Sequence, residues 1–318
     1  MPRQVIWLQQ PIHAAFYITT RCNLRCRHCY ISNYTSEMPA SAALEVVDAL
    51  ASIGTSRLSL LGGEPLVRDD LEHLVHQASS RGIRPLIGTN GTLMSAERAR
   101  SLITSGCTDF QISLEGHDPG LSDPVRGNDT FRRAIAAMRT LRELDGKVSL
   151  NVVISRANYP KISEIAHVAA ENGAHFLRLS AFIPQGSGQL YRNLYGLDRR
   201  IVGEVRRQIA DLLPRTPVPI IEGAFKKPSP NACGETFGCG AGTHSLTINP
   251  DLSLGACDLL SEHDRTRPLE SAAQILETWR MDGLFEKWRG RTEDPEFKSV
   301  HQHGCHLAMM RYGENIFA

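Results

Sequence analysis

Six short apolar runs alternate with six amphipathic segments along the first two thirds of the chain. The runs have the length and residue types of β-strands, and the segments between them repeat apolar residues at helical spacing. Parallel strands need a crossover between them, so this alternation predicts an α/β fold, a partial (β/α)6 barrel. The predicted strands are 13–19, 57–61, 84–89, 109–115, 147–155 and 175–182, and the predicted helices are 41–53, 68–80, 95–105, 129–144, 161–173 and 198–213.

The alternation of strands and helices ends near Leu213. Residues 214–230 contain five prolines, which cannot continue a helix or a central strand. Beyond them, residues 245–257 predict a β-hairpin that turns at residues 249–251, and residues 270–289 predict a helix. We therefore divide the chain into a core domain at residues 1–213 and a smaller C-terminal domain at residues 214–318.

Composition and charge exclude several classes of partner. The formal net charge is +1, so the charge balance does not favour nucleic acid or an anionic membrane surface. No apolar run approaches the ~20 residues of a membrane span, and the N-terminal residues do not resemble a signal peptide. These features predict a cytoplasmic protein, in which the eight cysteines are metal ligands or reactive thiols rather than disulfides.

Three cysteines lie close together directly after the first predicted strand. Cys22, Cys26 and Cys29 have C-x3-C-x2-C spacing and are followed by Tyr30. In β/α barrels, the loops at the carboxyl ends of the strands carry the chemistry. Thiolates at this spacing suit an iron–sulfur cluster or zinc, but a structural zinc would require a fourth nearby ligand. Three thiolates on a 4Fe–4S cluster would leave one iron open to bind another molecule.

This cysteine motif resembles the signature of radical S-adenosylmethionine (SAM) enzymes. The resemblance implies that Cys22, Cys26 and Cys29 hold a 4Fe–4S cluster whose open iron binds S-adenosyl-L-methionine. It also implies that an electron from the cluster cleaves SAM, and that the resulting 5′-deoxyadenosyl radical removes a hydrogen atom from the substrate. The TIM-like partial barrel implied by the family agrees with the strand–helix alternation.

Further motifs resemble the family's cofactor-binding segments. LLGGEP at residues 60–65 is similar to the GGE motif, in which glycines let the backbone approach the methionine part of SAM and the glutamate lies against its ammonium. ISLEGHDPGLSDPVRG at residues 112–127 is similar to the segment whose serine contacts SAM and whose arginine clamps its carboxylate. Glu115 is given no role, because many relatives have aspartate at this position. The residues that the resemblance assigns to SAM are Tyr30, Gly62, Gly63, Glu64, Ser113 and Arg126.

A second set of cysteines lies in the predicted C-terminal domain. It resembles a SPASM or twitch extension, an iron–sulfur module found in many radical SAM enzymes, and implies one auxiliary 4Fe–4S cluster. Zinc is the alternative occupant. The four ligands implied are Cys233, Cys239, Cys257 and Cys305. Asp258, directly after Cys257, is either a catalytic base, as proposed for similar sulfatase-maturating enzymes, or a residue that caps a turn. The remaining cysteine, Cys107, is expected to be a small buried residue.

Three functions are consistent with these motifs. The first is oxidation, cross-linking or epimerisation of a ribosomally made peptide, because many SPASM and twitch relatives act on peptides. The second is a small-molecule dehydrogenase or related enzyme in aminocyclitol or nucleoside-sugar biosynthesis. The third is a catalytically silent iron–sulfur protein, which the presence of the GGE motif together with all three loop cysteines argues against. An enzyme of either kind would require a reducing partner such as flavodoxin or ferredoxin.

Overall fold

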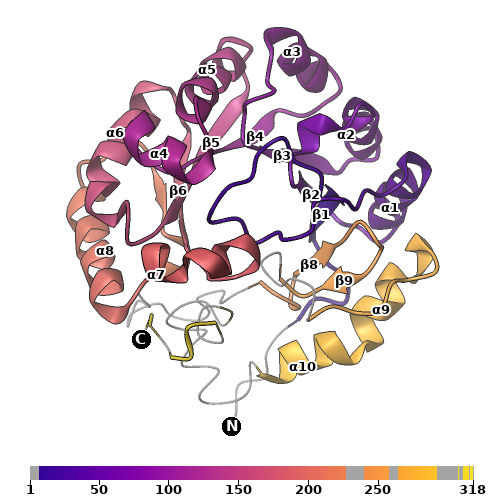
Figure 1. Ribbon diagram of the computed structural model, residues 1–318. Coiled ribbons are helices and arrows are strands. Elements are labelled where there is room, and N and C mark those ends of the chain that lie inside the picture. Colours follow the sequence, from indigo (N-terminus) through magenta and orange to yellow (C-terminus); the bar gives the residue numbers. More distant parts are fainter. Residues whose placement is uncertain are drawn as a thin grey trace.

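The computed structural model describes residues 7–226, 240–257, 264–291, 307, 311–314 and 316–317. The described strands form one curved sheet inside a ring of helices (Figure 1). The strands are β1 (His13–Thr19), β2 (Arg57–Gly62), β3 (Arg84–Thr89), β4 (Asp109–Leu114), β5 (Lys147–Ile154), β6 (Phe176–Ala181), β7 (Ile220–Ile221), β8 (Ser245–Ile248) and β9 (Leu254–Gly255). The helices are α1 (Ala40–Ser52), α2 (Leu71–Ser80), α3 (Ala96–Thr104), α4 (Pro119–Arg126), α5 (Thr130–Glu143), α6 (Ile162–Glu171), α7 (Arg192–Tyr195), α8 (Arg199–Leu212), α9 (Ile275–Met281) and α10 (Gly283–Arg291).

The sheet has the strand order β7-β6-β5-β4-β3-β2-β1-β8-β9. All of its neighbouring pairs are parallel except the hairpin β8–β9. Strands β1 to β6 begin and end within one residue of the predicted strands, and each is followed by one of the six predicted helices. The predicted α/β partial-barrel fold is therefore confirmed.

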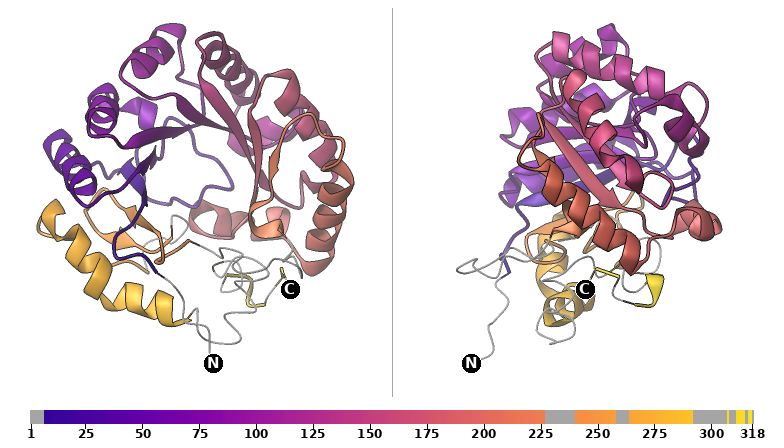
Figure 2. Two further views of the ribbon diagram at one scale, coloured as in Figure 1. Left: turned by 180° about the vertical axis from the view of Figure 1, so that it is seen from behind. Right: turned by 90° about the vertical axis from the view of Figure 1, so that its left-hand side faces the viewer.

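Each strand divides its side chains between two faces. In β5, Val148, Leu150, Val152 and Ile154 are fully buried against the surrounding helices, whereas the residues between them are more exposed. This alternation follows from the two-residue period of a strand. The helices cover the outer face of the curved sheet (Figure 2), so the more exposed, alternate positions of the strands face its inside.

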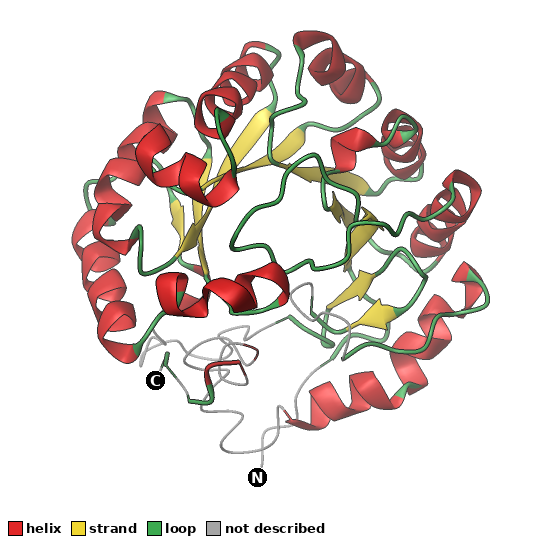
Figure 3. Cartoon of the chain, in the orientation of Figure 1, coloured by secondary structure: helices red, strands yellow, loops and turns green. Residues whose placement is uncertain are grey.

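Loop 20–39, which connects β1 to α1, crosses the centre of the ring (Figure 3). It leaves β1 at the carboxyl end of the sheet and therefore lies over the ends of the other parallel strands. The three cysteines of the first motif are all on this loop. The chain topology thus places the predicted cofactor-binding loop where barrel enzymes carry their chemistry.

The hairpin predicted at residues 245–257 is confirmed, and it extends the barrel sheet. Its first strand, β8, pairs in parallel with β1, and the hydrophobic core continues from the barrel to Trp279 of α9. The single helix predicted at residues 270–289 is wrong, because the chain forms α9 and α10 with a break at Asp282. The Asp282 backbone is extended, and its carboxylate accepts a hydrogen bond from the Leu284 N–H, which starts the second helix.

Candidate active site

Loop 20–39 is attached to the ends of several neighbouring strands and helices. Its backbone donates to α4 and accepts from the segments that follow β2 and β6, so it has a defined path across the sheet. These hydrogen bonds fix the positions from which the cysteines project. They are Glu64 N to Arg21 O (2.9 Å), Arg27 N to Val125 O (2.8 Å) and Gly188 N to Cys29 O (2.9 Å).

Cys22, Cys26 and Cys29 are free, partly buried thiols. Within the described residues, no three cysteine, histidine or acidic side chains converge on one metal ion. Three thiols that are held apart on one loop can each bind a different iron of a cluster, so this donor set fits a 4Fe–4S cluster. Burial raises the pKa of the Cys26 thiol to about 12, and a bound metal centre would favour its deprotonation.

The GGE segment joins β2 to the cysteine loop and to β3. A Cβ at Gly62 or Gly63 would overlap backbone oxygens at the end of β1 and the start of the loop. Glu64 is fully buried, and its carboxylate accepts hydrogen bonds from Leu66 N (3.0 Å), Thr89 Oγ1 (2.6 Å) and Asn90 N (2.7 Å). The close packing of this segment therefore requires glycine at both positions, in addition to the expected approach to SAM. Glu64 connects the ends of β2 and β3.

Tyr30 and Ser113 lie on different sides of the site. The hydroxyl of Tyr30 is 2.6 Å from that of Tyr17 on β1, which holds the end of the cysteine motif against the sheet. Ser113 is on the inner face of β4, in register with Asn151 of β5. Both residues are partly buried.

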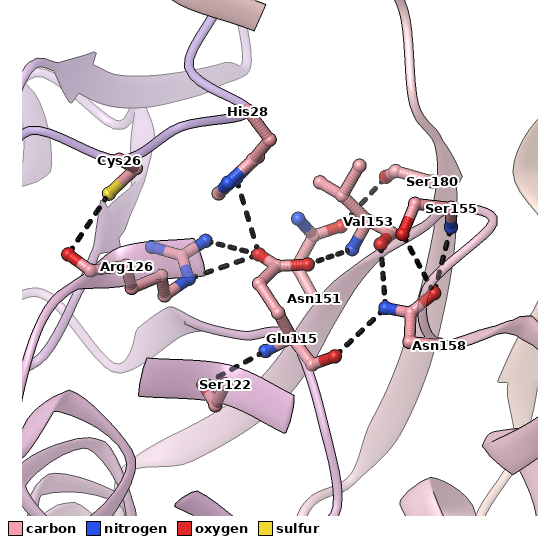
Figure 4. A network of polar contacts seen from close by, with 10 residues as sticks. All are labelled: Cys26, His28, Glu115, Ser122, Arg126, Asn151, Val153, Ser155, Asn158 and Ser180. Atoms are coloured by element: carbon pink, nitrogen blue, oxygen red, sulfur yellow. Dashed lines mark hydrogen bonds and ion pairs between the residues drawn. The ribbon is translucent and has the colours of Figure 1, made fainter. Parts of the chain in front are cut away.

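Glu115, to which the sequence assigned no role, is the centre of a buried polar network (Figure 4). Its Oε1 accepts hydrogen bonds from Arg126 Nε (3.0 Å) and Nη2 (2.6 Å), and Oε2 accepts one from Val153 N (2.9 Å). His28 Nε2 lies 3.3 Å from Oε1. The network therefore connects the cysteine loop through His28, α4 through Arg126 and β5 through Val153.

The charges in this network are set by burial. Burial raises the pKa of Glu115 to about 7, although Arg126 and the Val153 N–H both stabilise the carboxylate. Burial, assisted by the neighbouring Arg126, holds the pKa of His28 well below its ordinary value, so His28 is neutral beside Glu115. Asn158 fixes the backbone of Glu115 by donating from Nδ2 to its carbonyl at 2.8 Å.

Helix α4, which the sequence analysis did not predict, carries Arg126 to this site. The Asp118 side chain caps the helix by accepting from Leu121 N at 2.9 Å, and Pro119 occupies its first turn. An Asp–Pro pair is a recognisable helix start, so this helix could have been found in the sequence. Arg126 lies in the last turn, and Gly127 ends the helix with a φ of 124°.

Of the second cysteine set, only Cys257 is within the described residues. It is partly buried and lies two residues beyond the end of β9. Cys233, Cys239, Cys305 and Asp258 lie outside the described residues. Cys107 is fully buried and contacts backbone carbonyl oxygens, as expected, and burial raises its pKa to about 12.

Comparison with known proteins agrees with this geometry. The model of the Radical SAM superfamily matches residues 16–169, which include all three loop cysteines, the GGE segment and Arg126. Mycofactocin maturase MftC from Mycolicibacterium smegmatis is 30% identical over 296 residues, covering 89% of this chain and 73% of that protein. The chain belongs to the radical SAM superfamily. The resemblance stated from the sequence is therefore confirmed, and the cofactors of this superfamily are a 4Fe–4S cluster and SAM.

Other radical SAM proteins match over different lengths. The AdoMet-dependent heme synthase of Methanosarcina barkeri is 32% identical over 179 residues, which is 55% of this chain and 51% of that protein. Streptococcus suis SuiB, solved with its precursor peptide SuiA, superposes with a TM-score of 0.80 at 18% identity, covering 98% of this chain and 75% of SuiB. The structure of anSMEcpe with bound AdoMet gives a TM-score of 0.73 at 16% identity, covering 93% of this chain and 90% of that chain. These superpositions confirm the fold.

Among the residues that the structure describes, no helix is both long and apolar enough to cross a bilayer.

Proposed function

We propose that this radical SAM enzyme modifies a ribosomally made peptide, by oxidation, cross-linking or epimerisation. The observation that carries the proposal is the 30% identity to a maturase, mycofactocin maturase MftC, over 89% of this chain. The fold relatives add support, because SuiB was solved with a precursor peptide and anSMEcpe with a Cp18Cys peptide. The small-molecule and silent alternatives are outcomes of the experiments below.

In this proposal, Cys22, Cys26 and Cys29 hold the 4Fe–4S cluster. The cluster and SAM, when bound, supply abstraction of a hydrogen atom from the substrate. The protein binds and orients SAM and keeps water away from the reacting atoms. The attachment of the cysteine loop to β2, α4 and β6 supports this role, because a ligand loop must have a fixed position to orient its cofactor.

The proposed SAM contacts are distributed over the ends of the strands. Arg126 has five N–H donors, of which Glu115 accepts two, so the others are available to the carboxylate of SAM. Glu64 is proposed to attract the ammonium of SAM. Burial of its carboxylate favours this attraction, because charges interact more strongly away from water. The remaining proposed contacts are Tyr30, Gly62, Gly63 and Ser113.

An auxiliary 4Fe–4S cluster on Cys233, Cys239, Cys257 and Cys305 completes the proposal, within a C-terminal domain at residues 214–318. Asp258 is proposed as the base that takes a proton from the substrate. Iron quantitation of the reconstituted protein is expected to give about eight irons per chain, from two four-iron clusters. A content of about four irons per chain, together with bound zinc, would contradict the auxiliary iron–sulfur cluster. The proposed electron donor is flavodoxin or ferredoxin, and the thiol ligands favour a reducing cytoplasm.

The proposed function is tested under anaerobic conditions. The reconstituted protein is incubated with SAM, dithionite and a precursor peptide encoded next to its gene, and 5′-deoxyadenosine and peptide mass are both measured. We expect 5′-deoxyadenosine together with a changed peptide mass, and Cys26→Ala is expected to abolish both. Formation of 5′-deoxyadenosine that accompanies oxidation of a small alcohol, with no peptide change, would refute peptide modification. No 5′-deoxyadenosine under any condition would favour the silent alternative.

A further inference from the structure

Arg178 is a cation on the inner face of the sheet that has no partner among the described residues. In β6, Leu177 and Leu179 are fully buried against the outer helices. The alternate residues of the strand, Arg178 and Ser180, therefore face inward. Arg178 is exposed, and no described carboxylate, hydroxyl or carbonyl contacts its guanidinium. Its five N–H donors are thus available to a molecule inside the curved sheet.

A second donor lies beside it and is held in a fixed orientation. Asn151 of β5 is the register partner of Arg178, so the two side chains project from neighbouring strands on one face. Ser180 Oγ donates to Asn151 Oδ1 at 2.8 Å (Figure 4), and the Nδ2 amino group of Asn151 has no partner in the part of the chain that the structure describes. The site therefore has two hydrogen-bond donors side by side, the guanidinium of Arg178 and an oriented amide of Asn151 on the neighbouring strand.

The pair lies near the proposed SAM contacts. Ser113 of β4 is the register partner of Asn151 on its other side, so Ser113, Asn151 and Arg178 form a row across three strands. Neighbouring strands are about 4.8 Å apart, which puts Arg178 on the order of 10 Å from Ser113 along the sheet. A group bound at Arg178 would therefore belong to a molecule beside SAM rather than to SAM itself.

We propose that Arg178 and Asn151 form a receptor for a carboxylate of the substrate. A guanidinium donates two parallel N–H bonds to a carboxylate, and the Asn151 amide adds a donor from the side. This inference rests on the proposed peptide substrate and deepens it: the peptide carries a carboxylate near the residue that is modified. That carboxylate belongs either to the peptide C-terminus or to an aspartate or glutamate side chain.

The test uses the full chain without SAM or turnover. Arginine residues are modified with phenylglyoxal, and the rate at Arg178 is followed by mass spectrometry of its peptide. The α-carboxylate probe is N-acetylglycine with N-acetylglycinamide as its control, and the side-chain probe is N-acetylaspartic acid α-amide with the asparagine equivalent. We expect a carboxylate probe to slow modification about threefold at twice its dissociation constant, whereas neither amide protects. The probe that protects identifies the source of the carboxylate.

Controls within the same barrel make the result specific. Arg57 faces inward at the start of β2, and its guanidinium has no partner among the described residues, so it should react equally with and without probe. Asn151→Asp supplies an internal carboxylate, and it should slow modification of Arg178 and remove protection by the probe. Asn151→Ala should weaken protection. Equal protection by acids and amides, or equal protection of Arg57 and Arg178, would overturn the receptor.

A negative result here is distinguishable from failure of the proposed function. Protection of Arg178 depends only on a carboxylate and the folded chain, whereas the proposed function is judged by 5′-deoxyadenosine and peptide mass. Peptide modification with no protection of Arg178 would refute the receptor alone.

Discussion

Replacing Glu115 by glutamine removes the carboxylate that, among the described residues, is the only one paired with the buried Arg126. Glutamine has nearly the same shape, so the change tests charge and hydrogen bonding rather than packing. Oε1 of Glu115 accepts both Arg126 bonds, and Oε2 accepts the bond from Val153 N. Glutamine keeps one oxygen and turns the other acceptor into a donor, so either Arg126 or Val153 must lose its acceptor.

The expected cost follows from burial. Arg126 is 8% exposed and Glu115 is 2% exposed, so neither lost bond can be replaced fully by water. Breaking a buried ion pair by removing one partner costs about 3–5 kcal/mol, because the other charge stays buried and uncompensated. We therefore expect Glu115→Gln to lower the free energy of unfolding by about 3 kcal/mol, because a buried donor of Arg126 or Val153 loses its acceptor. The raised pKa of Glu115 acts in the opposite direction, because the wild type loses stability as the pH rises towards about 7 and the glutamine variant does not, so the loss should be larger at pH 5 than at pH 8.

Anaerobic urea unfolding of the reconstituted protein, followed by tryptophan fluorescence, measures this loss. Hydrogen exchange of the Val153 amide provides a local readout, because its protection should fall in the variant. The double variant Glu115→Leu with Arg126→Met removes both charges, and it should cost less than the sum of the two single changes by about 1–3 kcal/mol. A loss below about 0.5 kcal/mol, with unchanged Val153 protection and additive variants, would refute the reasoning.

Three further predictions concern separate parts of the molecule. Gly63→Ala should reduce iron binding by the first cluster loop, because its Cβ would overlap the carbonyl oxygen of Arg21; the control Gly203→Ala, where a Cβ meets nothing within 4 Å, should raise unfolding stability by about 1 kcal/mol. Cys107 should resist N-ethylmaleimide from pH 7 to pH 9 in the folded protein, because burial raises its pKa to about 12 and keeps it a thiol; rapid labelling before unfolding would contradict this. Arg289→Ala should cost about 2–4 kcal/mol in urea unfolding, because the guanidinium stacks on three aromatic rings and donates to two backbone carbonyls; a change near zero would show that these contacts are not stabilising.

The fold could be predicted because its signals are local. Strand β5 alternates buried and exposed residues, and the helix at 130–143 repeats apolar residues on one side, so each element is visible in its own segment. The break between α9 and α10 was missed, because one aspartate, Asp282, overrides helical spacing by capping a new helix. Helix α4 was missed although Asp118 and Pro119 mark its start.

The candidate site was predictable only where its residues form a spaced motif. Cys22, Cys26 and Cys29 stand within eight residues, and their chemistry follows from residue type and spacing. Glu115 and His28 carry no such signal, because their partners are 11 to 87 positions away in the chain. The contacts of Glu115 with His28 and Val153 cannot be predicted from sequence spacing, because they form only when the barrel brings the ends of β1, β4 and β5 together.

The sequence by itself determined the strand–helix alternation and the three-cysteine loop, and its motifs indicated membership of the radical SAM superfamily. Such features depend on side-chain type and short-range spacing, which the chain states directly. Only the tertiary structure decided which residues meet at the carboxyl ends of the strands. It placed Glu115 between the cysteine loop and Arg126, and it aligned Arg178 with Asn151. These contacts depend on the register of parallel strands and on burial, which arise only when distant segments pack together.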